Sequence, residues 1–282
     1  MLKKKVAIYP GCLILYRFPE YESSAKQLLQ LCGYEITFLP QALCCGSYLE
    51  GINPNWFNFT AYNLALAEKE NVSLITLCGG CTNTFYRVQQ MFREKPEMLH
   101  QVNLKLAEFD LKLTQTIEVQ HLIKVLYEQQ ASLKMLKLRS LNLKVAPVYP
   151  CQVYRPGSIM HFDHPLKPKS LSALISITGA TPIHYPQEHE CCGSSLYLSK
   201  PEMAFQIGKQ RIENLKEREA DVAVTACGNC HLLLQRFQSQ YISGTPLPII
   251  FFSQLIGLAL GLEPAQLHIT NPSLRRMIKN AF

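Results

Sequence analysis

Residues 6–12 read VAIYPGC, and residues 145–151 read VAPVYPC. In each stretch a short run of apolar residues is typical of a buried β-strand, and the proline that follows indicates a turn. A cysteine comes directly after each turn, Cys12 in the first stretch and Cys151 in the second. A strand, a turn and a cysteine that recur in the same order indicate an internal repeat.

The other cysteines follow the same repeat. Each copy continues with an adjacent pair, a glycine and a Cys-x-x-Cys, which gives Cys12, Cys44-Cys45-Gly46 and Cys78-x-x-Cys81 in the first copy and Cys151, Cys191-Cys192-Gly193 and Cys227-x-x-Cys230 in the second. Of the eleven cysteines only Cys32 lies outside the repeat, and we expect it to be a small buried apolar side chain. The repeat predicts two domains, residues 1–143 and 144–282, with one Cys-Cys-Gly (CCG) motif each.

The segments between the cysteines predict the fold class. Helical periodicity occurs in residues 21–31, 58–71, 171–177 and 203–219, and strand-like runs occur in residues 35–39, 74–77, 182–185 and 222–225. Residues 117–126 and 247–262 are each typical of a strand that continues into a helix. Residues 95–116 indicate an extra helical insertion, and residues 134–144 indicate a linker. Strands that alternate with helices in this way predict an α/β protein with two pseudo-symmetric Rossmann-like domains, each built on a parallel sheet.

Composition and charge exclude several classes of protein. A chain of 282 residues with 48% apolar residues, 14 Gly and 17 Pro is neither disordered, nor collagenous, nor a small disulfide-stapled scaffold. The N-terminus carries no apolar stretch of signal-peptide type, so we expect a cytoplasmic protein whose thiols are reduced. The formal charge of +7 falls to about +1 if ten thiolates bind two cationic cofactors. We therefore expect no nucleic-acid partner.

The cysteine pattern predicts a metal centre in each half. Cys12, Cys78, Cys151 and Cys227 follow predicted strands, and the carboxyl ends of parallel strands are where such sheets bind ligands. Five thiols per half exceed the four of a structural zinc site, and adjacent cysteines suit a larger polynuclear core such as an iron–sulfur cluster. Zinc in one half, or buried thiols with no ligand role, are the alternatives.

The motifs resemble a known family. Cys-x31-Cys-Cys-Gly-x31-Cys-x-x-Cys and its second copy, together with residues 9–12 (YPGC), 17–22 (RFPEYE), 78–84 (CGGCTNT) and 255–262 (LIGLALGL), are similar to the paired CCG domains of the heterodisulfide reductase B-subunit family. The likeness covers nearly the whole chain and departs from the family at Gln152, where relatives often carry histidine. The resemblance implies a non-cubane [4Fe-4S] cluster in each half. It assigns as ligands Cys12, Cys44, Cys45, Cys78, Cys81, Cys151, Cys191, Cys192, Cys227 and Cys230.

The resemblance is compatible with two different functions, because similar subunits occur in two kinds of redox complex. In heterodisulfide reductase, the similar subunit carries the site where a disulfide is cleaved. In type E succinate dehydrogenase, a similar CCG subunit accompanies iron–sulfur and flavoprotein subunits and passes electrons towards quinone at the membrane. The chain has no Gly-x-Gly-x-x-Gly before a helix and no P-loop, so electrons are expected from partner subunits. A relay subunit without a substrate of its own is the third alternative.

Two histidines and one apolar segment carry further hypotheses. His161 and His231 lie near the second set of cysteines in the sequence and are candidate proton donors. Residues 247–262 are mostly apolar but too short to span a bilayer. They predict either a core strand and helix, or a peripheral segment in the membrane interface with Arg275, Arg276 and Lys279 facing anionic lipid.

Overall fold

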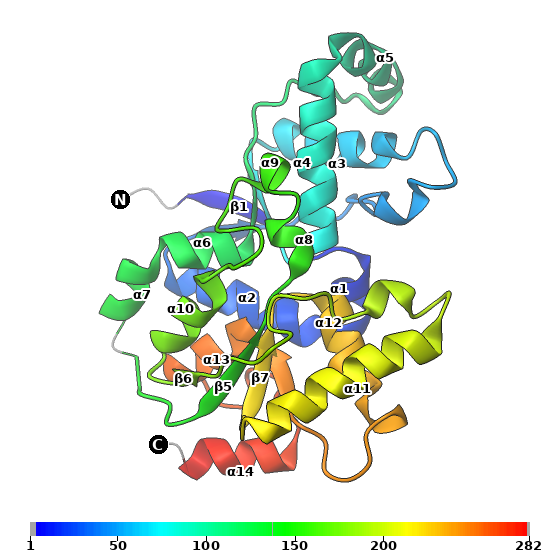
Figure 1. The fold of residues 1–282 in the computed structure, drawn as a ribbon. Coiled ribbons are helices and arrows are strands. Elements are labelled where there is room, and N and C mark those ends of the chain that lie inside the picture. The colour runs from blue at the N-terminus through cyan, green and yellow to red at the C-terminus, as the bar shows by residue number, and fades with distance from the viewer. Residues whose placement is uncertain (1–3, 137, 281–282) are drawn as a thin grey trace.

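The protein contains two four-stranded parallel sheets, one from each half of the chain (Figure 1). The structure is a computed structural model that describes residues 4–136 and 138–280. The strand order is β2-β1-β3-β4 in the first sheet and β6-β5-β7-β8 in the second. The same order in both sheets matches the predicted pair of pseudo-symmetric Rossmann-like units. The domain boundary at residue 143 stays a prediction.

The first sheet consists of β1 (Lys5–Tyr9), β2 (Glu35–Thr37), β3 (Ser73–Thr76) and β4 (Val119–His121). The central strand β1 is buried on both faces. Val6 and Ile8 point to one hydrophobic core, and Ala7 and Tyr9 point to another, as the alternation of side chains along a strand requires. All pairs are parallel, so a helix must carry the chain back after each strand.

The second sheet consists of β5 (Lys144–Val148), β6 (Thr181–Pro182), β7 (Val222–Thr225) and β8 (Ile249–Phe251). Its edge strand β6 is shorter than the predicted run of residues 182–185. Ile183 N donates to Val145 O at 2.9 Å, but the next donor on β5 would be Pro147, which has no N–H. The proline inside β5 therefore explains why the pairing with β6 ends there.

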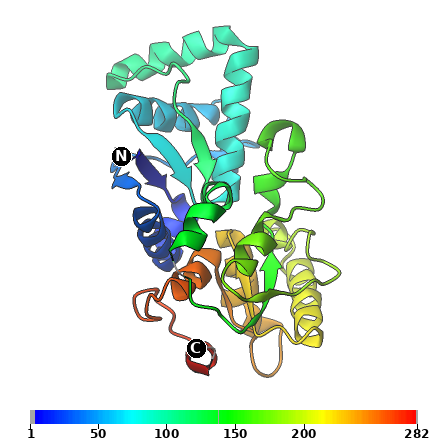
Figure 2. The same cartoon turned by 90° about the vertical axis from the view of Figure 1, so that its left-hand side faces the viewer.

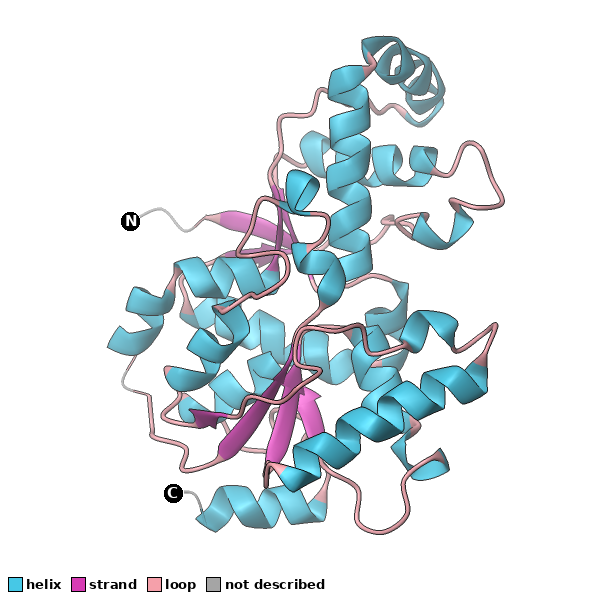
Figure 3. Cartoon of the chain, viewed as in Figure 1, coloured by secondary structure: helices cyan, strands magenta, loops and turns pink. Residues whose placement is uncertain are grey.

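Helices cover both faces of each sheet, as the colouring of Figure 3 shows. The first half contains α1 (Cys12–Arg17), α2 (Pro19–Leu31), α3 (Phe57–Lys69), α4 (Gly79–Glu94), α5 (Pro96–Leu106), α6 (Leu122–Glu128), α7 (Gln130–Met135) and the short helices η1 (Ser47–Leu49) and η2 (Ala107–Phe109). The second contains α8 (Cys151–Tyr154), α9 (Gly157–Met160), α10 (Ser170–Ser176), α11 (Pro201–Glu217), α12 (Gly228–His231), α13 (Phe252–Ala259), α14 (Pro272–Asn280), η3 (Ser194–Leu196), η4 (Leu232–Arg236) and η5 (Gln238–Gln240). The insertion predicted at 95–116 forms α5 and η2, which project from the first half (Figure 1).

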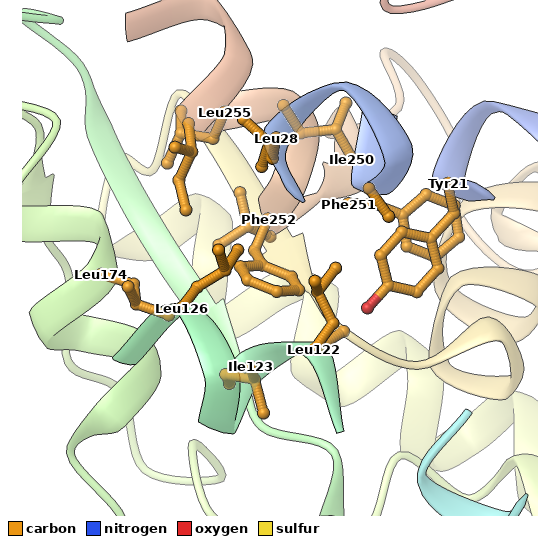
Figure 4. Close-up of a cluster of buried hydrophobic side chains, with 14 of the residues drawn as sticks. Tyr21, Leu28, Leu122, Ile123, Leu126, Leu174, Ile250, Phe251, Phe252 and Leu255 are labelled. Atoms are coloured by element: carbon orange, nitrogen blue, oxygen red, sulfur yellow. The ribbon is translucent and has the colours of Figure 1, made fainter. Parts of the chain in front are cut away.

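The two halves share one hydrophobic core. Helices α2 and α6 of the first half and α10 and α13 of the second lie between the two sheets, in both views (Figures 1 and 2). Figure 4 shows side chains of these helices and of β8 in one cluster, with Tyr21 and Leu28 near Phe251 and Leu255, and Leu126 near Leu174. Burial of each such side chain contributes roughly 1.5–3 kcal/mol. The interface between the two halves is therefore packed like the hydrophobic core of a single domain.

The apolar segment 247–262 belongs to this shared core. It forms β8 and α13, whose side chains Phe251, Phe252, Leu255 and Leu258 are at most 1% exposed. The prediction of a core strand and helix is confirmed, and the alternative of a lipid-facing segment is wrong for these residues because protein already covers them. Among the described helices, none is both long and apolar enough to cross a bilayer.

Candidate functional site

Each half brings its cysteines to the carboxyl end of its own sheet. Cys12 begins α1 directly after β1, and Cys151 begins α8 after β5. Cys78 and Cys227 follow β3 and β7 and are the N-cap residues of α4 and α12. The cysteines therefore meet where parallel sheets bind ligands.

The five thiols of the first half form a chain of hydrogen bonds between sulfur atoms. Cys12 bonds to Cys44, Cys44 to Cys45, Cys45 to Cys81, and Cys81 to Cys78. This series of hydrogen bonds includes every cysteine of the first repeat. The structure thus brings the five predicted site residues of this half together in one cluster.

The second half repeats the same chain of contacts. Cys151 bonds to Cys191, Cys191 to Cys192, Cys192 to Cys230, and Cys230 to Cys227. Cys32, in contrast, lies at the end of α2, is half-buried and packs against the shared core. The duplication seen in the sequence is thus a duplication of the site.

Cys44 in the first set and Cys191 in the second have the most strongly lowered pKa of their sets. The pKa of Cys44 is lowered to about 2, mainly because Cys12 donates a hydrogen bond to it, and the Gly46 amide also donates to its sulfur at 3.5 Å. The pKa of Cys191 is lowered to about 2, mainly by Cys151, and the Gly193 amide donates at 3.4 Å. The thiolate is the form that binds metal.

The donor set and the backbone around it fit an iron–sulfur cluster. Gly46 and Gly193 adopt φ values of 86° and 87°, a left-handed conformation that glycine favours, and their amides donate to the first sulfur of each adjacent pair. Among the described residues, no three His, Cys, Asp or Glu side chains are grouped around the position of a single metal ion. A chain of five sulfurs suits a larger, polynuclear core. Zinc in one half stays an alternative that metal analysis tests.

Substitution of Gly11 should weaken iron binding in the first half and leave iron binding in the second half unchanged. Gly11 has φ 77°, and a methyl group there would lie 2.7 Å from Cys81 Sγ. We expect Gly11→Ala to lower the iron bound by the first half, measured as iron per chain. Gly33→Ala is the matched control, because Gly33 has φ 85° and no atom within 4 Å of the added methyl. It should cost only the backbone strain, roughly 1–2 kcal/mol, and keep its iron; equal iron loss in both variants would contradict this assignment.

The two sets lie close to the interface between the halves. Gly80 of the first Cys-x-x-Cys is so near Gln152 that an added Cβ would lie 2.8 Å from Oε1, and Asn83 Nδ2 donates to Arg155 O at 2.9 Å. Burial raises the pKa of Tyr21, and Cys227 and Cys78 raise it further. One of these thiols belongs to each set, so a single buried hydroxyl is within electrostatic range of both.

The two candidate histidines differ in their surroundings. His161 is exposed at the end of α9 with φ 42°. His231 is 5% exposed, and its ring stacks on Phe251 at 4.4 Å and meets Phe18 edge-on at 4.8 Å. Burial lowers the pKa of His231 to about 3, which keeps its ring neutral and does not favour a proton-donor role near neutral pH.

Two buried polar side chains hold the CCG loops and were missed in the sequence. Asn63 Nδ2 of α3 donates to Leu43 O at 3.1 Å and to Cys44 O at 3.3 Å. Arg211 of α11 donates to Glu190 O at 3.0 Å and to Cys191 O at 3.2 Å. The available signal was spacing, since Arg211 lies four residues from the buried Leu215 on the apolar side of the helix.

Comparison with known proteins agrees with this geometry. The family model of the cysteine-rich domain (CCG) matches residues 6–86 and 145–235. The chain is 27% identical over 284 residues to the B subunit of ferredoxin:CoB-CoM heterodisulfide reductase from Methanosarcina mazei, with 97% of this chain and 95% of the relative covered. It is 28% identical to the 8-methylmenaquinol:fumarate reductase membrane anchor subunit of Wolinella succinogenes, over 96% of this chain and 97% of the relative.

A solved structure shares the fold. A hypothetical protein from Helicobacter pylori matches with a TM-score of 0.73 and 16% identity, over 95% of this chain and 51% of that chain. The predicted resemblance to the B subunit of heterodisulfide reductase and to the CCG subunit of succinate dehydrogenase is confirmed by the Methanosarcina relative and by the Wolinella relative, whose name is that of a fumarate reductase subunit. The chain belongs to the CCG cysteine-rich domain family and carries two copies of the domain.

Proposed function

We propose that the chain is the iron–sulfur subunit of an oxidoreductase complex and binds two non-cubane [4Fe-4S] clusters, one in each half. The ten cysteines of the two sulfur chains are the proposed ligands, and residues 1–143 and 144–282 are the proposed domains. The observation that carries the proposal is the duplicated set of five thiols, joined in each half by a linear series of hydrogen bonds. The names of the Methanosarcina and Wolinella relatives, both subunits of redox complexes, support it.

The proposed reaction is the transfer of two electrons to a disulfide or a quinone-type acceptor. A disulfide that takes up two electrons and two protons loses its S–S bond and becomes two thiols, and a quinone becomes a quinol. When bound, the two clusters would supply the electrons one at a time. Partner iron–sulfur and flavoprotein subunits would deliver these electrons. Gly80 is next to Cys81 and Gln152 is next to Cys151, so their contact across the interface brings the two sets of cysteines near one another, as an acceptor that receives electrons from both would require.

The second candidate is an electron relay and peripheral anchor without a substrate of its own. Arg275, Arg276 and Lys279 of α14, with Arg139, line a cavity of about 530 Å³, and the half-buried Leu262 also lines it. Basic side chains beside an apolar one suit the surface of an anionic membrane. The membrane-anchor name of the Wolinella relative supports this candidate. For either candidate we propose a cytoplasmic location, which for the anchor is peripheral on the cytoplasmic face of a membrane.

The acceptor can be tested on the purified chain under anaerobic conditions. After reduction with dithionite and its removal, the protein is mixed with an alkyl disulfide or a short-chain naphthoquinone, and reoxidation is followed by absorbance. A reductase is expected to return to the oxidised spectrum and release two thiols per disulfide, or one quinol per quinone. Clusters that neither acceptor reoxidises would overturn the reductase proposal and favour the relay.

A further inference from the structure

The side chain that holds the second CCG loop is charged, and its counterpart in the first half is neutral. Arg211 is 1% exposed; besides the two carbonyls of its loop, its Nη1 donates to the Tyr185 hydroxyl at 3.4 Å. Within the part of the chain that the structure describes, it forms no ion pair with a carboxylate. The guanidinium therefore keeps a positive charge beside the second set that no carboxylate neutralises.

Asn63 makes the matching contacts in the first half without a charge. It is also 1% exposed, and its Oδ1 accepts a hydrogen bond from Leu43 N at 2.7 Å while its Nδ2 donates to two carbonyls of the same loop. Both side chains thus bind the backbone at the first cysteine of the adjacent pair, Cys44 or Cys191. The two sites are held alike and differ by one buried positive charge.

That charge acts on the thiols of the second half. The groups that interact electrostatically with Arg211 are the Tyr185 hydroxyl and the thiols of Cys192, Cys230 and Cys191. In a protein interior, two charges interact several times more strongly than at the same distance in water. A cluster gains one negative charge on reduction, so a nearby buried cation stabilises the reduced form and raises the reduction potential.

Other charges near the two sites do not cancel this difference. In the first half, Arg87 pairs with Glu50, and both side chains are more than one third exposed, so the pair is neutral and screened by solvent. In the second half, Arg155 donates to the His189 carbonyl, and the buried Glu188 pairs with His184 at 2.8 Å. Among the described residues, neither Glu188 nor any other carboxylate forms an ion pair with Arg211, so its charge remains.

We propose that Arg211 is a positioning residue that gives the second-half cluster the higher reduction potential of the two. At equilibrium, an electron that enters the chain then resides mainly on the second-half cluster. This inference rests on the proposed function, because it requires a cluster in each half. It gives the relay within the chain a direction, from the site held by Asn63 to the site held by Arg211. The acceptor would then take its first electron from the second half.

The test is an EPR-monitored redox titration of the full chain with both clusters present. Unmodified protein should show two midpoint potentials, and Arg211→Gln, which keeps amide donors but removes the charge, should lower the higher one. We expect at least a tenfold change in the ratio of reduced to oxidised cluster at fixed potential, which is about 59 mV for one electron. Arg211→Lys keeps the charge and should retain most of the potential.

Controls separate this inference from the proposed function. Lys209→Gln removes an exposed cation of the same helix, one that lies 3.9 Å from Glu213, and should leave both potentials unchanged. Equal midpoints in the unmodified protein, or equal shifts in Arg211→Gln and Arg211→Lys, would overturn the role of the charge while the two clusters stand. A chain with fewer than two clusters would overturn the proposed function instead. If Arg211→Gln loses iron, the other two proteins still test the inference. Equal midpoint potentials in the unmodified protein, or a clear fall of the higher potential in Arg211→Lys, would overturn the role of the charge.

Discussion

Replacement of Cys45 by serine is expected to lower the iron content of the chain from about eight atoms to about four. Cys45 joins Cys44 to Cys81 in the first sulfur chain, so its loss divides that set of ligands. The second set shares no cysteine with the first and should keep its cluster. Iron and acid-labile sulfide per chain, measured after anaerobic purification, report the change.

Two further substitutions make this experiment decisive. Cys192→Ser removes the corresponding thiol of the second set and should also halve the iron, but with the EPR signal of the other cluster remaining. Cys32→Ser is the matched control, because Cys32 lies outside both sets and packs against the core. Complete loss of iron in either single variant would indicate one shared centre, and full retention in both would contradict the assignment of ligands.

Replacement of Phe251 by alanine is expected to lower the free energy of unfolding by about 3–5 kcal/mol. The ring is 0% exposed and is stacked between Tyr21 at 4.2 Å and His231 at 4.4 Å. Tyr21 comes from the first half and His231 follows Cys230 of the second, so the cavity would open in the shared core. Urea unfolding followed by far-UV circular dichroism, on samples of equal iron content, measures the loss.

An exposed phenylalanine provides the comparison for this variant. Phe38 is 69% exposed, and Phe38→Ala should change the free energy of unfolding by no more than about 0.5 kcal/mol. Equal effects of the two substitutions, or a loss below about 1 kcal/mol for Phe251→Ala, would mean that the interface between the halves does not act as a core.

The sequence predicted those features that are local or repeated. A strand, a turn and a cysteine are adjacent in the chain, so the placement of Cys12 and Cys151 at strand ends followed from the pattern alone. The repeat then predicted the second sheet from the first. The membrane alternative for residues 247–262 was wrong because an apolar segment does not reveal what covers it, and here α2 of the other half does.

Features that depend on contacts between distant segments could not be predicted in this way. The role of Arg211 depends on which carbonyls the turn of the CCG loop presents to α11, and no local pattern specifies that. The shortening of β6 required knowing that Pro147 faces it across the sheet. The stacking of Tyr21 on Phe251 joins residues of the two halves, which the repeat places in separate units.

The most direct test of the account is the content of iron, acid-labile sulfide and zinc per chain, with EPR of the oxidised protein, after anaerobic purification. Two complete sets of five thiols predict about eight iron and eight sulfide, with no stoichiometric zinc. Stoichiometric zinc without sulfide would contradict the central claim that each half of the chain is built around an iron–sulfur cluster.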